Sequence, residues 1–442
     1  MLAAFGLSSH TSIEKEIVAL TDDLIIGADG IILATGPSGS GKSSITRIIL
    51  DELLVIDNTC AIGPCDRTPI IEQWPAPPET RAAMLAAAGL GDPFSWTKTP
   101  KQLSDGQRHR FELFHKLYYG SSVVLVDNFC EALDQVTAQA VAWSFARTAR
   151  RLGKLVIIAT TRNDLLRSIR PDCHIKTTHE GIAQVRHHRR RASASPLQQR
   201  ITIRQGEYDD WKRIRHHHYA GDDPRCITNI LTATIDKDPS PAGVLIFASP
   251  KLRCAERNIA TQNRFNTGNQ KLNACLLNRE VRTLSRIVIR PDLRGIGLSK
   301  RMIRHAMRQL HVMYVECIAA MSEYHSFLQQ VGFVRYEAPE TPALGELRKW
   351  SRETQLPPEA LTRPTRIIEH LALSSDRQRR RGRRAIWQLY HHQIVNKRTR
   401  KPTPTRVPNP CDPRWIDAAA FAARRLDTTP AYWLKKFCTE SS

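Results

Sequence analysis

The 442-residue sequence lacks several features that would place it in a common class. It has 10 cysteines but no Cys-x-x-Cys pair and no metal-like spacing with histidine, so we expect reduced thiols and no zinc site. No apolar run approaches the roughly 20 residues of a membrane-spanning helix. No internal repeat is visible, and the first residues carry neither a basic start nor a long apolar core. These absences favour a cytoplasmic protein with no membrane insertion and no secretory signal.

Negative charge is scarce in the C-terminal two-thirds. The formal net charge is +22, yet residues 1–183 hold 18 Lys and Arg against 20 Asp and Glu. Residues 184–359 hold 29 against 17, and residues 360–442 hold 18 against 6. This asymmetry favours a polyanionic partner, most simply nucleic acid; an acidic protein or a solubility effect is the alternative.

Apolar patterns divide the chain into an α/β region, a second mixed region and an extension. Up to residue 182, strand-like runs alternate with helical stretches, which predicts a parallel sheet covered by helices. A basic linker, residues 183–199, leads to a second region, residues 200–350, for which we expect an α+β fold. Residues 351–442 form a basic C-terminal extension, first Arg-rich and then punctuated by proline.

The clearest motif is GPSGSGKSS, which follows the strand-like GIILAT and opens a helical run. It fits G-x-x-x-x-G-K-[ST], a P-loop, in which backbone N–H groups at a helix N-terminus cradle phosphates. Lys42 would reach the β- and γ-phosphates, and the Ser43 hydroxyl would bind Mg²⁺. Asp127, which ends the strand SSVVLVD, would help to hold Mg²⁺; a strand-end Asp that caps a turn is the alternative. The expected nucleotide contacts are Gly36, Ser38, Gly39, Ser40, Gly41, Lys42, Ser43 and Ser44.

Two strings downstream of the P-loop resemble motifs of ABC-type ATPases. LSDGQ, residues 103–107, resembles the signature motif LSGGQ, and Ala-Leu-Asp at residues 132–134 resembles the D-loop. The resemblance covers about residues 25–180. It implies an ABC nucleotide-binding domain that pairs head to tail in a homodimer. The signature residues of one chain, Ser104, Gly106 and Gln107, would then contact the ATP held by its partner.

Two positions depart from the ABC pattern. Asn128 stands where the family usually has a glutamate base, and Thr161 where it usually has histidine. An amide cannot take a proton from water, and general-base catalysis contributes about 10²–10⁴-fold, so we expect ATP to be bound but hydrolysed slowly. Glu131 could act as the base from a different loop position. Gln73, in PIIEQWP, is a candidate contact to the metal or its water.

A second glycine-containing turn, LRGIGLS, follows the strand SRIVIRP and opens a basic amphipathic helix. Its N–H groups would suit a pyrophosphate, and a tight turn without a ligand is the alternative. The turn resembles the R-x-x-G-x-G/A loop of the GNAT acyltransferases, with Ser299 replacing the last Gly or Ala, and the likeness covers about residues 200–340. It implies acyl-CoA as donor. The expected contacts are Ile289, Arg294, Gly295, Ile296, Gly297, Leu298 and Ser299.

Further candidates flank this turn. In GNAT enzymes a tyrosine after the next strand often protonates the leaving thiolate, which makes Tyr324 a candidate acid; packing is its alternative role. His217 or His218, together with Tyr219, would face the acceptor; a solvated surface is the alternative. Trp387 and Tyr390, which lie among arginines, could stack on bases, or belong to a solvated helix. The fusion resembles a prokaryotic group of ABC–GNAT chains whose GNAT part is akin to the phage Mom type. The Mom type modifies adenine in DNA.

Three functions therefore stay open at the level of sequence. The first is an acyl-CoA-dependent transferase, governed by ATP, that acts on nucleic acid or an associated protein. The second is an ATP-gated nucleic-acid clamp in which the GNAT-like region only docks. The third is the ATP-binding subunit of a transporter. The fused second region, the roughly 60 residues between P-loop and signature, and Asn128 all disfavour the third.

Overall fold

The computed structural model describes most of the chain, in several stretches. These are residues 28–52, 63–188, 194–218, 223–236, 238–319, 327–337, 340–357, 359–362, 364–391, 407, 414–427 and 431–437. The chain divides into two compact units. The first comprises Met1–Ser249, Arg282–Val312 and Tyr324–Val331; the second comprises Pro250–Val281, Met313–Glu323 and Gly332–Ser442. This division differs from the expected boundaries at residues 182, 200 and 350, which stay predictions.

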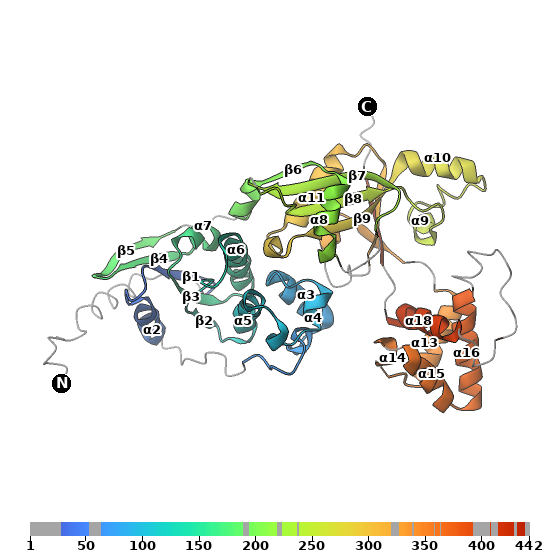
Figure 1. Cartoon of the computed structure of the whole chain (residues 1–442), viewed down its shortest axis with the longest axis horizontal. Helices are drawn as coiled ribbons and strands as arrows, with labels where there is room; N and C mark the ends of the chain where they lie inside the picture. The colour runs from blue at the N-terminus through green and yellow to red at the C-terminus, as the bar shows by residue number, and fades with distance from the viewer. Residues whose placement is uncertain are drawn as a thin grey trace. The chain divides into compact units, whose positions relative to one another are not determined.

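The first sheet of the first unit has the strand order β2–β3–β1–β4–β5 (Figure 1). Its strands are β1 (Ile31–Thr35), β2 (Val123–Val126), β3 (Leu155–Thr160), β4 (Cys173–Thr178) and β5 (Gly181–His187). The pairs β2–β3, β3–β1 and β1–β4 are parallel, and only β5 runs antiparallel to its neighbour. This confirms the α/β expectation for the region. Because parallel strands end at one edge, the loops after β1, β2 and β3 meet there.

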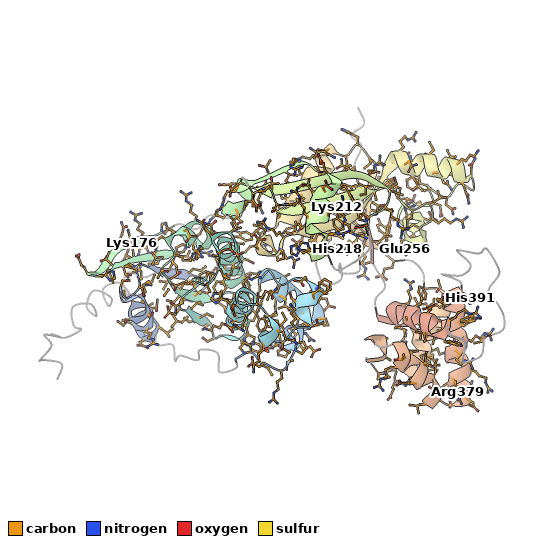
Figure 2. All side chains as sticks on the ribbon, viewed as in Figure 1. Lys176, Lys212, His218, Glu256, Arg379 and His391 are labelled. Carbon is orange, nitrogen blue, oxygen red and sulfur yellow. The ribbon has the colours of Figure 1, made fainter. Side chains whose placement is uncertain are left out.

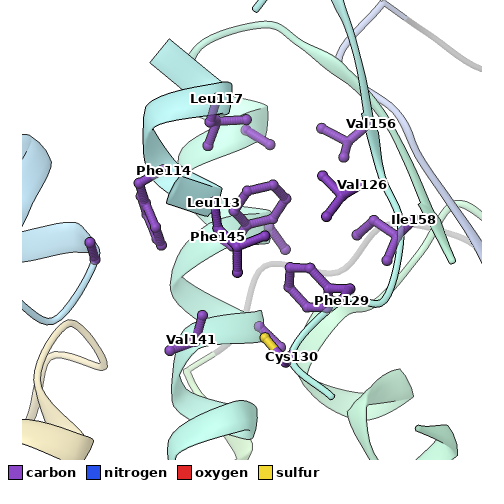
Figure 3. Close-up of a cluster of buried hydrophobic side chains, with 14 of the residues drawn as sticks. Leu113, Phe114, Leu117, Val126, Phe129, Cys130, Val141, Phe145, Val156 and Ile158 are labelled. Atoms are coloured by element: carbon purple, nitrogen blue, oxygen red, sulfur yellow. The ribbon is translucent and has the colours of Figure 1, made fainter. Parts of the chain in front are cut away.

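Three helices carry most of the packing of this sheet: α2 (Lys42–Glu52), α5 (Asp105–Tyr119) and α6 (Gln135–Arg151). Figure 3 shows Leu113, Phe114 and Leu117 of α5 in one apolar cluster with side chains of α6 and the strands. The rings of Phe114 and Phe145 meet edge to face, with centroids 5.7 Å apart. This core fixes α5 and α6, whose first turns carry the signature motif and the D-loop.

Shorter helical elements complete the first unit. They are η2 (Ile70–Glu72), α3 (Pro78–Ala87), α4 (Pro93–Trp96), η3 (Pro100–Gln102), η4 (Asn163–Leu165), α7 (Leu166–Ile169), η5 (Pro196–Arg200), η6 (Arg215–His217), η7 (Pro291–Leu293) and α12 (Phe327–Gln330). Asp92 caps α4 by accepting a hydrogen bond from the Ser95 amide at 2.9 Å. No described helix of the chain combines the length and the apolarity that crossing a bilayer requires.

A second sheet of the first unit is antiparallel. It joins β6 (Ile201–Gln205), β7 (Ile227–Ile235), β8 (Gly243–Ala248) and β9 (Val281–Ile289) in sequence order. The helices α8 (Tyr208–Ile214) and α11 (Leu298–Gln309) contact this sheet, and Trp211 of α8 is 1% exposed. The turn LRGIGLS lies between β9 and α11, as expected.

The second unit contains the helices α9 (Ala255–Ala260) and α10 (Gln270–Glu280). It also contains β10 (Tyr314–Ala319), β11 (Val334–Tyr336) and β12 (Ala431–Lys436), in which β12 pairs antiparallel with both other strands. A fully buried ion pair joins Arg257 to Glu316, with N–O distances of 2.7 and 2.9 Å. Tyr432 donates a hydrogen bond to the same carboxylate at 2.8 Å, so this buried charge is fully partnered.

The remaining helices of the second unit form a cluster with its own core. They are α13 (Pro342–Glu353), α14 (Glu359–Thr362), α15 (Pro364–Leu373), α16 (Asp376–Tyr390) and α18 (Arg414–Asp427). Trp350, Trp387 and Trp415 belong to this core, and Trp387 is only 2% exposed. The expectation that Trp387 stacks on bases is therefore wrong, because its ring is buried among these helices. Tyr390 is partly buried against the same core.

Candidate functional site

The P-loop connects β1 to α2 at the carboxyl edge of the parallel sheet. Gly39 and Gly41 have φ values of +77° and +79°, which suit a loop that turns its N–H groups inward. Gly36 lies tight against β4, where a Cβ would come within 2.1 Å of Thr177 Oγ1. The Ser40 hydroxyl is hydrogen-bonded to that same Thr177 oxygen at 2.6 Å. Ser38 and Ser44, the other two predicted contacts of this loop, are exposed.

At the start of α2, a hydroxyl oxygen of the helix meets a carboxylate oxygen from the end of β2. Ser43 Oγ donates a hydrogen bond to Asp127 Oδ2 at 2.7 Å, and Asp127 Oδ1 accepts one from the Asn128 amide at 2.8 Å. A hydroxyl and a carboxylate fit Mg²⁺, which prefers oxygen ligands and keeps several waters. The described residues hold no cluster of three or more His, Cys, Asp or Glu that could bind a metal alone. The remaining ligands of such an ion would be water and phosphate oxygens.

Lys42 is folded over the P-loop and is 8% exposed. Its Nζ donates a hydrogen bond to the Pro37 carbonyl at 2.6 Å. This contact keeps the ammonium within the loop that would hold the phosphates. The structure thus brings together Lys42, Ser43 and Asp127, as the motif predicts, while their role toward a nucleotide stays a prediction.

The ends of β2 and β3 place the positions that depart from the ABC pattern. Asn128 has φ +51°, a left-handed conformation that asparagine tolerates better than most residues. Glu131 Oε1 accepts a hydrogen bond from the Thr161 amide at 2.9 Å. Asn128 therefore lies beside the Ser43–Asp127 pair, whereas the carboxylate of Glu131 is held at the end of β3.

The signature motif forms the start of α5. Ser104 caps the helix, since its Oγ accepts from the Gln107 amide at 3.4 Å while Gln107 Oε1 accepts from the Ser104 amide at 3.1 Å. This reciprocal capping box leaves the helix N-terminus at the surface. Gly106 lies close to the D-loop, where a Cβ would be 3.3 Å from Leu133 Cδ2. The D-loop residue Asp134 in turn caps α6 through the Thr137 amide at 3.0 Å.

Gln73 is used within its own loop. Its Oε1 accepts a hydrogen bond from the Cys65 amide at 2.9 Å. Its Nε2 donates to the carbonyls of Cys65, at 2.7 Å, and Thr68, at 3.0 Å. The structure therefore does not direct this amide to the Ser43–Asp127 pair, and a metal contact would require these three hydrogen bonds to be exchanged.

The second glycine turn packs against α3, α4 and α6 of the same unit. Arg294 Nη1 donates to Asp92 Oδ2 at 2.8 Å, and its Nε donates to the Ile289 carbonyl at 3.1 Å. Gly295 has φ +85°, and a Cβ there would lie 3.1 Å from Ser144 Oγ and 3.2 Å from the Ala87 carbonyl. Burial lowers the pKa of Arg294, and the contact with Asp92 opposes that shift.

The other predicted acyl-CoA contacts share this packing. Ile296 is 0% exposed, and its carbonyl accepts a hydrogen bond from Gln198 Nε2. Gly297 has φ +83° and precedes α11, Leu298 is buried, and Ser299 is partly buried. The turn thus has the predicted local conformation but is covered by protein at Arg294 and Ile296. Tyr324 lies outside the described residues.

Sequence reasoning missed two residues that lie around the second glycine turn, Arg110 and Asp92. Arg110 of α5 donates from Nε to the Gly106 carbonyl at 3.1 Å and from Nη1 to the Gly89 carbonyl at 3.4 Å. A Cβ on Gly89 would lie 3.6 Å from the Pro291 carbonyl, so this arginine joins the signature turn to the neighbourhood of the second turn. An arginine in register with the apolar positions of α5 was the available signal. Nothing local distinguished Asp92 from an ordinary helix cap.

His217 lies near the ion pair of Arg294 and Asp92. Burial lowers its pKa to about 4, and the neighbouring His216 and Arg294 add to the shift. The nearby carboxylates of Asp292 and Asp92 oppose it. This histidine is therefore neutral near pH 7 beside the Arg294–Asp92 pair.

The P-loop between β1 and α2, with a serine–carboxylate pair at its base, defines a P-loop nucleotide-binding module. No protein-family model matches the chain. Part of the chain is similar to the methionine import ATP-binding protein MetN of two strains of Xanthomonas oryzae pv. oryzae. Each is 26% identical over 192 residues, which cover 35% of this chain and 57% of the relative. The chain therefore spans little more than half the length of these curated relatives.

Solved structures of a cassette also align with part of the chain. Two dimeric structures of the bacterial ABC transporter cassette MJ0796, one of them bound to ADP and Pi, are 19% identical. Each alignment covers 38% of this chain and 88% of the cassette, with TM-scores of 0.29 and 0.30. By these sequence relatives, the part of the chain that carries the P-loop is similar to ATP-binding proteins of import systems.

Proposed function

We propose that the N-terminal module binds Mg-ATP as an ABC-type ATPase and hydrolyses it slowly. The contact of Ser43 Oγ with Asp127 Oδ2, 2.7 Å long, carries this proposal because it prepares the oxygen ligands of Mg²⁺ beneath a P-loop. The loop N–H groups and Lys42 would hold the phosphates. Mg²⁺, when bound, neutralises phosphate charge during transfer to water.

Slow hydrolysis follows from the residue after Asp127. The side chain of Asn128 can orient a water by hydrogen bonding, but it cannot remove its proton. The carboxylate of Glu131 accepts a hydrogen bond from the Thr161 amide, so acting as a base would require it to exchange that contact. The module would then hold ATP for long periods, as a switch does.

A second copy would complete this site. The N-terminus of α5, a helix of 15 residues, ends in Ser104 and Gln107 at the surface. Its N–H groups and dipole suit the terminal phosphate of an ATP bound by another chain. A head-to-tail homodimer, stable only with ATP, is the expected assembly.

The second turn would serve an acyl-CoA-dependent transfer on or near nucleic acid. The left-handed Gly295 and Gly297 before α11 support this reading, because they set up a phosphate-binding helix start. The contact of Arg294 with Asp92 favours the second candidate, an ATP-gated clamp without transferase activity, since it occupies the arginine. Titration with acetyl-CoA separates the two, as a clamp has no affinity for it.

A transporter subunit is a further candidate, favoured only by the printed role of the MetN relatives in methionine import. It would need a separate membrane partner, and the fused second sheet disfavours it. Binding of the chain to a purified importer membrane subunit would support this candidate.

The central test is equilibrium binding of ATP with Mg²⁺ to the full chain, compared with Lys42→Ala. Loss of a charged hydrogen bond to phosphate costs about 1.5–3 kcal/mol, so the variant should bind about 10–100-fold more weakly. Ultracentrifugation with and without ATP measures the dimer. A wild-type chain without measurable ATP affinity would refute the proposal.

A further inference from the structure

The helix α16 presents two very different faces. Ser375 caps it through the Gln378 amide, and Figure 2 shows Arg379 and His391 near its opposite ends. One face packs into the helical core of the second unit through Gly382, Ala385, Ile386 and Leu389. The packing there is tight, since a Cβ on Gly382 would lie 2.5 Å from the Trp350 ring. The helix is therefore a fixed element with a defined outer surface.

Its outer face carries Arg377, Arg380 and Arg384, which we name the arginine stripe. All three are exposed, and their i, i+3, i+7 spacing places them along one side of the helix. None of the three has an ion-pair partner in the part of the chain that the structure describes. Their neighbours differ: Arg379 pairs with Asp376, and Arg381 pairs with two glutamates of α13. The stripe is thus a row of exposed positive charge without an ion-pair partner among the described residues, whereas Arg379 and Arg381 on the same helix are paired.

We propose that the arginine stripe binds the phosphate backbone of a double-stranded nucleic acid. This inference rests on the nucleic-acid part of the proposed function and assigns it a surface. Seven residues of helix extend about 10 Å, and one strand of a duplex presents a phosphate about every 3.4 Å along its axis. Three guanidinium groups over this length match about three phosphates. Each can bind its phosphate through two hydrogen bonds.

The surroundings of the stripe favour a duplex over the alternatives. Trp387 and Trp415 are 2% and 4% exposed, so they offer no platform on which single-stranded bases could stack. Arg414 and Arg383 lie over these two rings, each 5.3 Å from a centroid, so they are engaged within the unit. No large apolar side chain of the described α16 is exposed, and a lipid surface would require such side chains. The stripe therefore offers charge alone, which recognises a backbone without reading bases.

The test measures the affinity of the full chain for a fluorescent 20-base-pair DNA duplex at several salt concentrations, with ATP and Mg²⁺ present. The triple variant Arg377→Gln, Arg380→Gln, Arg384→Gln should weaken binding at low salt by at least 10-fold. Each lost phosphate contact removes about 0.9 from the slope of log affinity against log salt, so the slope should fall by about 2 to 3. Circular dichroism and thermal melting check that the variant folds.

A matched control removes the same charge from the same helical cluster, at positions on α13, α15 and α16. Arg348, Arg366 and Arg379 each pair with a carboxylate, of Glu340, Glu369 and Asp376. Changing these three to Gln should leave the slope within about 1 of wild type, because a paired arginine displaces few counterions from DNA. This control separates the stripe from net charge.

Each outcome decides between the inference and the function on which it rests. A wild type that binds duplex while the stripe variant keeps its slope overturns the inference and leaves the nucleic-acid function intact. Equal losses in both triple variants also overturn it, in favour of net charge. Tighter binding to single strands, or to phosphatidylserine vesicles, assigns the surface to another ligand. A wild type that binds no nucleic acid defeats the nucleic-acid part of the proposed function itself.

Discussion

The first unit contains two glycine turns that look alike locally and differ in what surrounds them. Both follow a strand, contain two glycines with positive φ and open a helix: Gly39 and Gly41 before α2, and Gly295 and Gly297 before α11. A Cβ on Gly39 would meet no atom within 4 Å, whereas one on Gly295 would meet Ser144 and Ala87. The first turn is open at Gly39 and Gly41, and the second is packed against other elements of the unit at Gly295.

A phosphate-loop motif is often taken to predict both the backbone conformation and the exposure of its N–H groups. The two turns show that these properties are separate. Glycine spacing determines the backbone path, because only a few residues tolerate a left-handed conformation. It does not determine whether the resulting N–H groups face solvent. In the second turn the arginine that the GNAT pattern assigns to pyrophosphate is 16% exposed and bound to Asp92.

The largest expected effect tests whether the lack of a general base limits the rate of ATP hydrolysis at the first turn. Asn128→Glu supplies a general base and should raise single-turnover ATP hydrolysis by about 10²-fold or more. The left-handed backbone of Asn128 is less favourable for glutamate, so stability should fall by about 1 kcal/mol. Asn128→Asp is the matched control, since it adds a carboxylate that is one methylene shorter and tolerates this backbone. An unchanged rate in both variants would show that the missing base is not the limit.

The next effect concerns the closed turn. Asp92→Asn leaves the partly buried Arg294 without its charge partner and should destabilise the chain toward urea by about 1.5–3 kcal/mol. It should also free the arginine and raise the affinity for acetyl-CoA about 3–10-fold if the turn binds it. The control is Asp66→Asn, whose pair with Lys101 is exposed on both sides, at 51% and 73%, and contributes little. Equal destabilisation by the two variants would contradict the packed state of the second turn.

Features that depend on residues close together in the sequence could be predicted, and features that depend on residues far apart could not. The turns, the parallel strands and the closeness of Ser43 to Asp127 follow from short motifs and strand order. The Arg294–Asp92 contact joins positions 202 residues apart, and no local period carries that information. The burial of Trp387 was encoded by the spacing of Gly382, Ala385, Ile386 and Leu389, but the surrounding arginines concealed this apolar face. The arginine content of α16 predicted its exposed surface, and the spacing of its small and apolar residues predicted its buried face.

A matched pair of glycine substitutions compares the two turns directly. Gly39→Ala and Gly295→Ala both place a side chain at positive φ, which costs about 1–2 kcal/mol each. Only Gly295→Ala also brings a Cβ to 3.1 Å from Ser144 Oγ, so its loss of stability should exceed that of Gly39→Ala by about 1 kcal/mol. Urea unfolding of the two variants measures the difference. Equal losses would mean that the second turn has room that the structure does not show.

The smallest effect is a pH dependence confined to the second turn. The pKa of His217 is about 4 in the packed state against an ordinary 6.5, so the packed state binds its proton less readily than an opened one. As pH falls from about 6.5 toward 4, proton uptake therefore favours opening, and packing strengthens again as pH rises. Hydrogen exchange at residues 294–297, expressed as protection factors, should show less protection at pH 5 than at pH 7. Residues 38–41 provide the internal reference, and His217→Asn should remove most of the change, because it takes away the histidine whose pKa is lowered in the packed state.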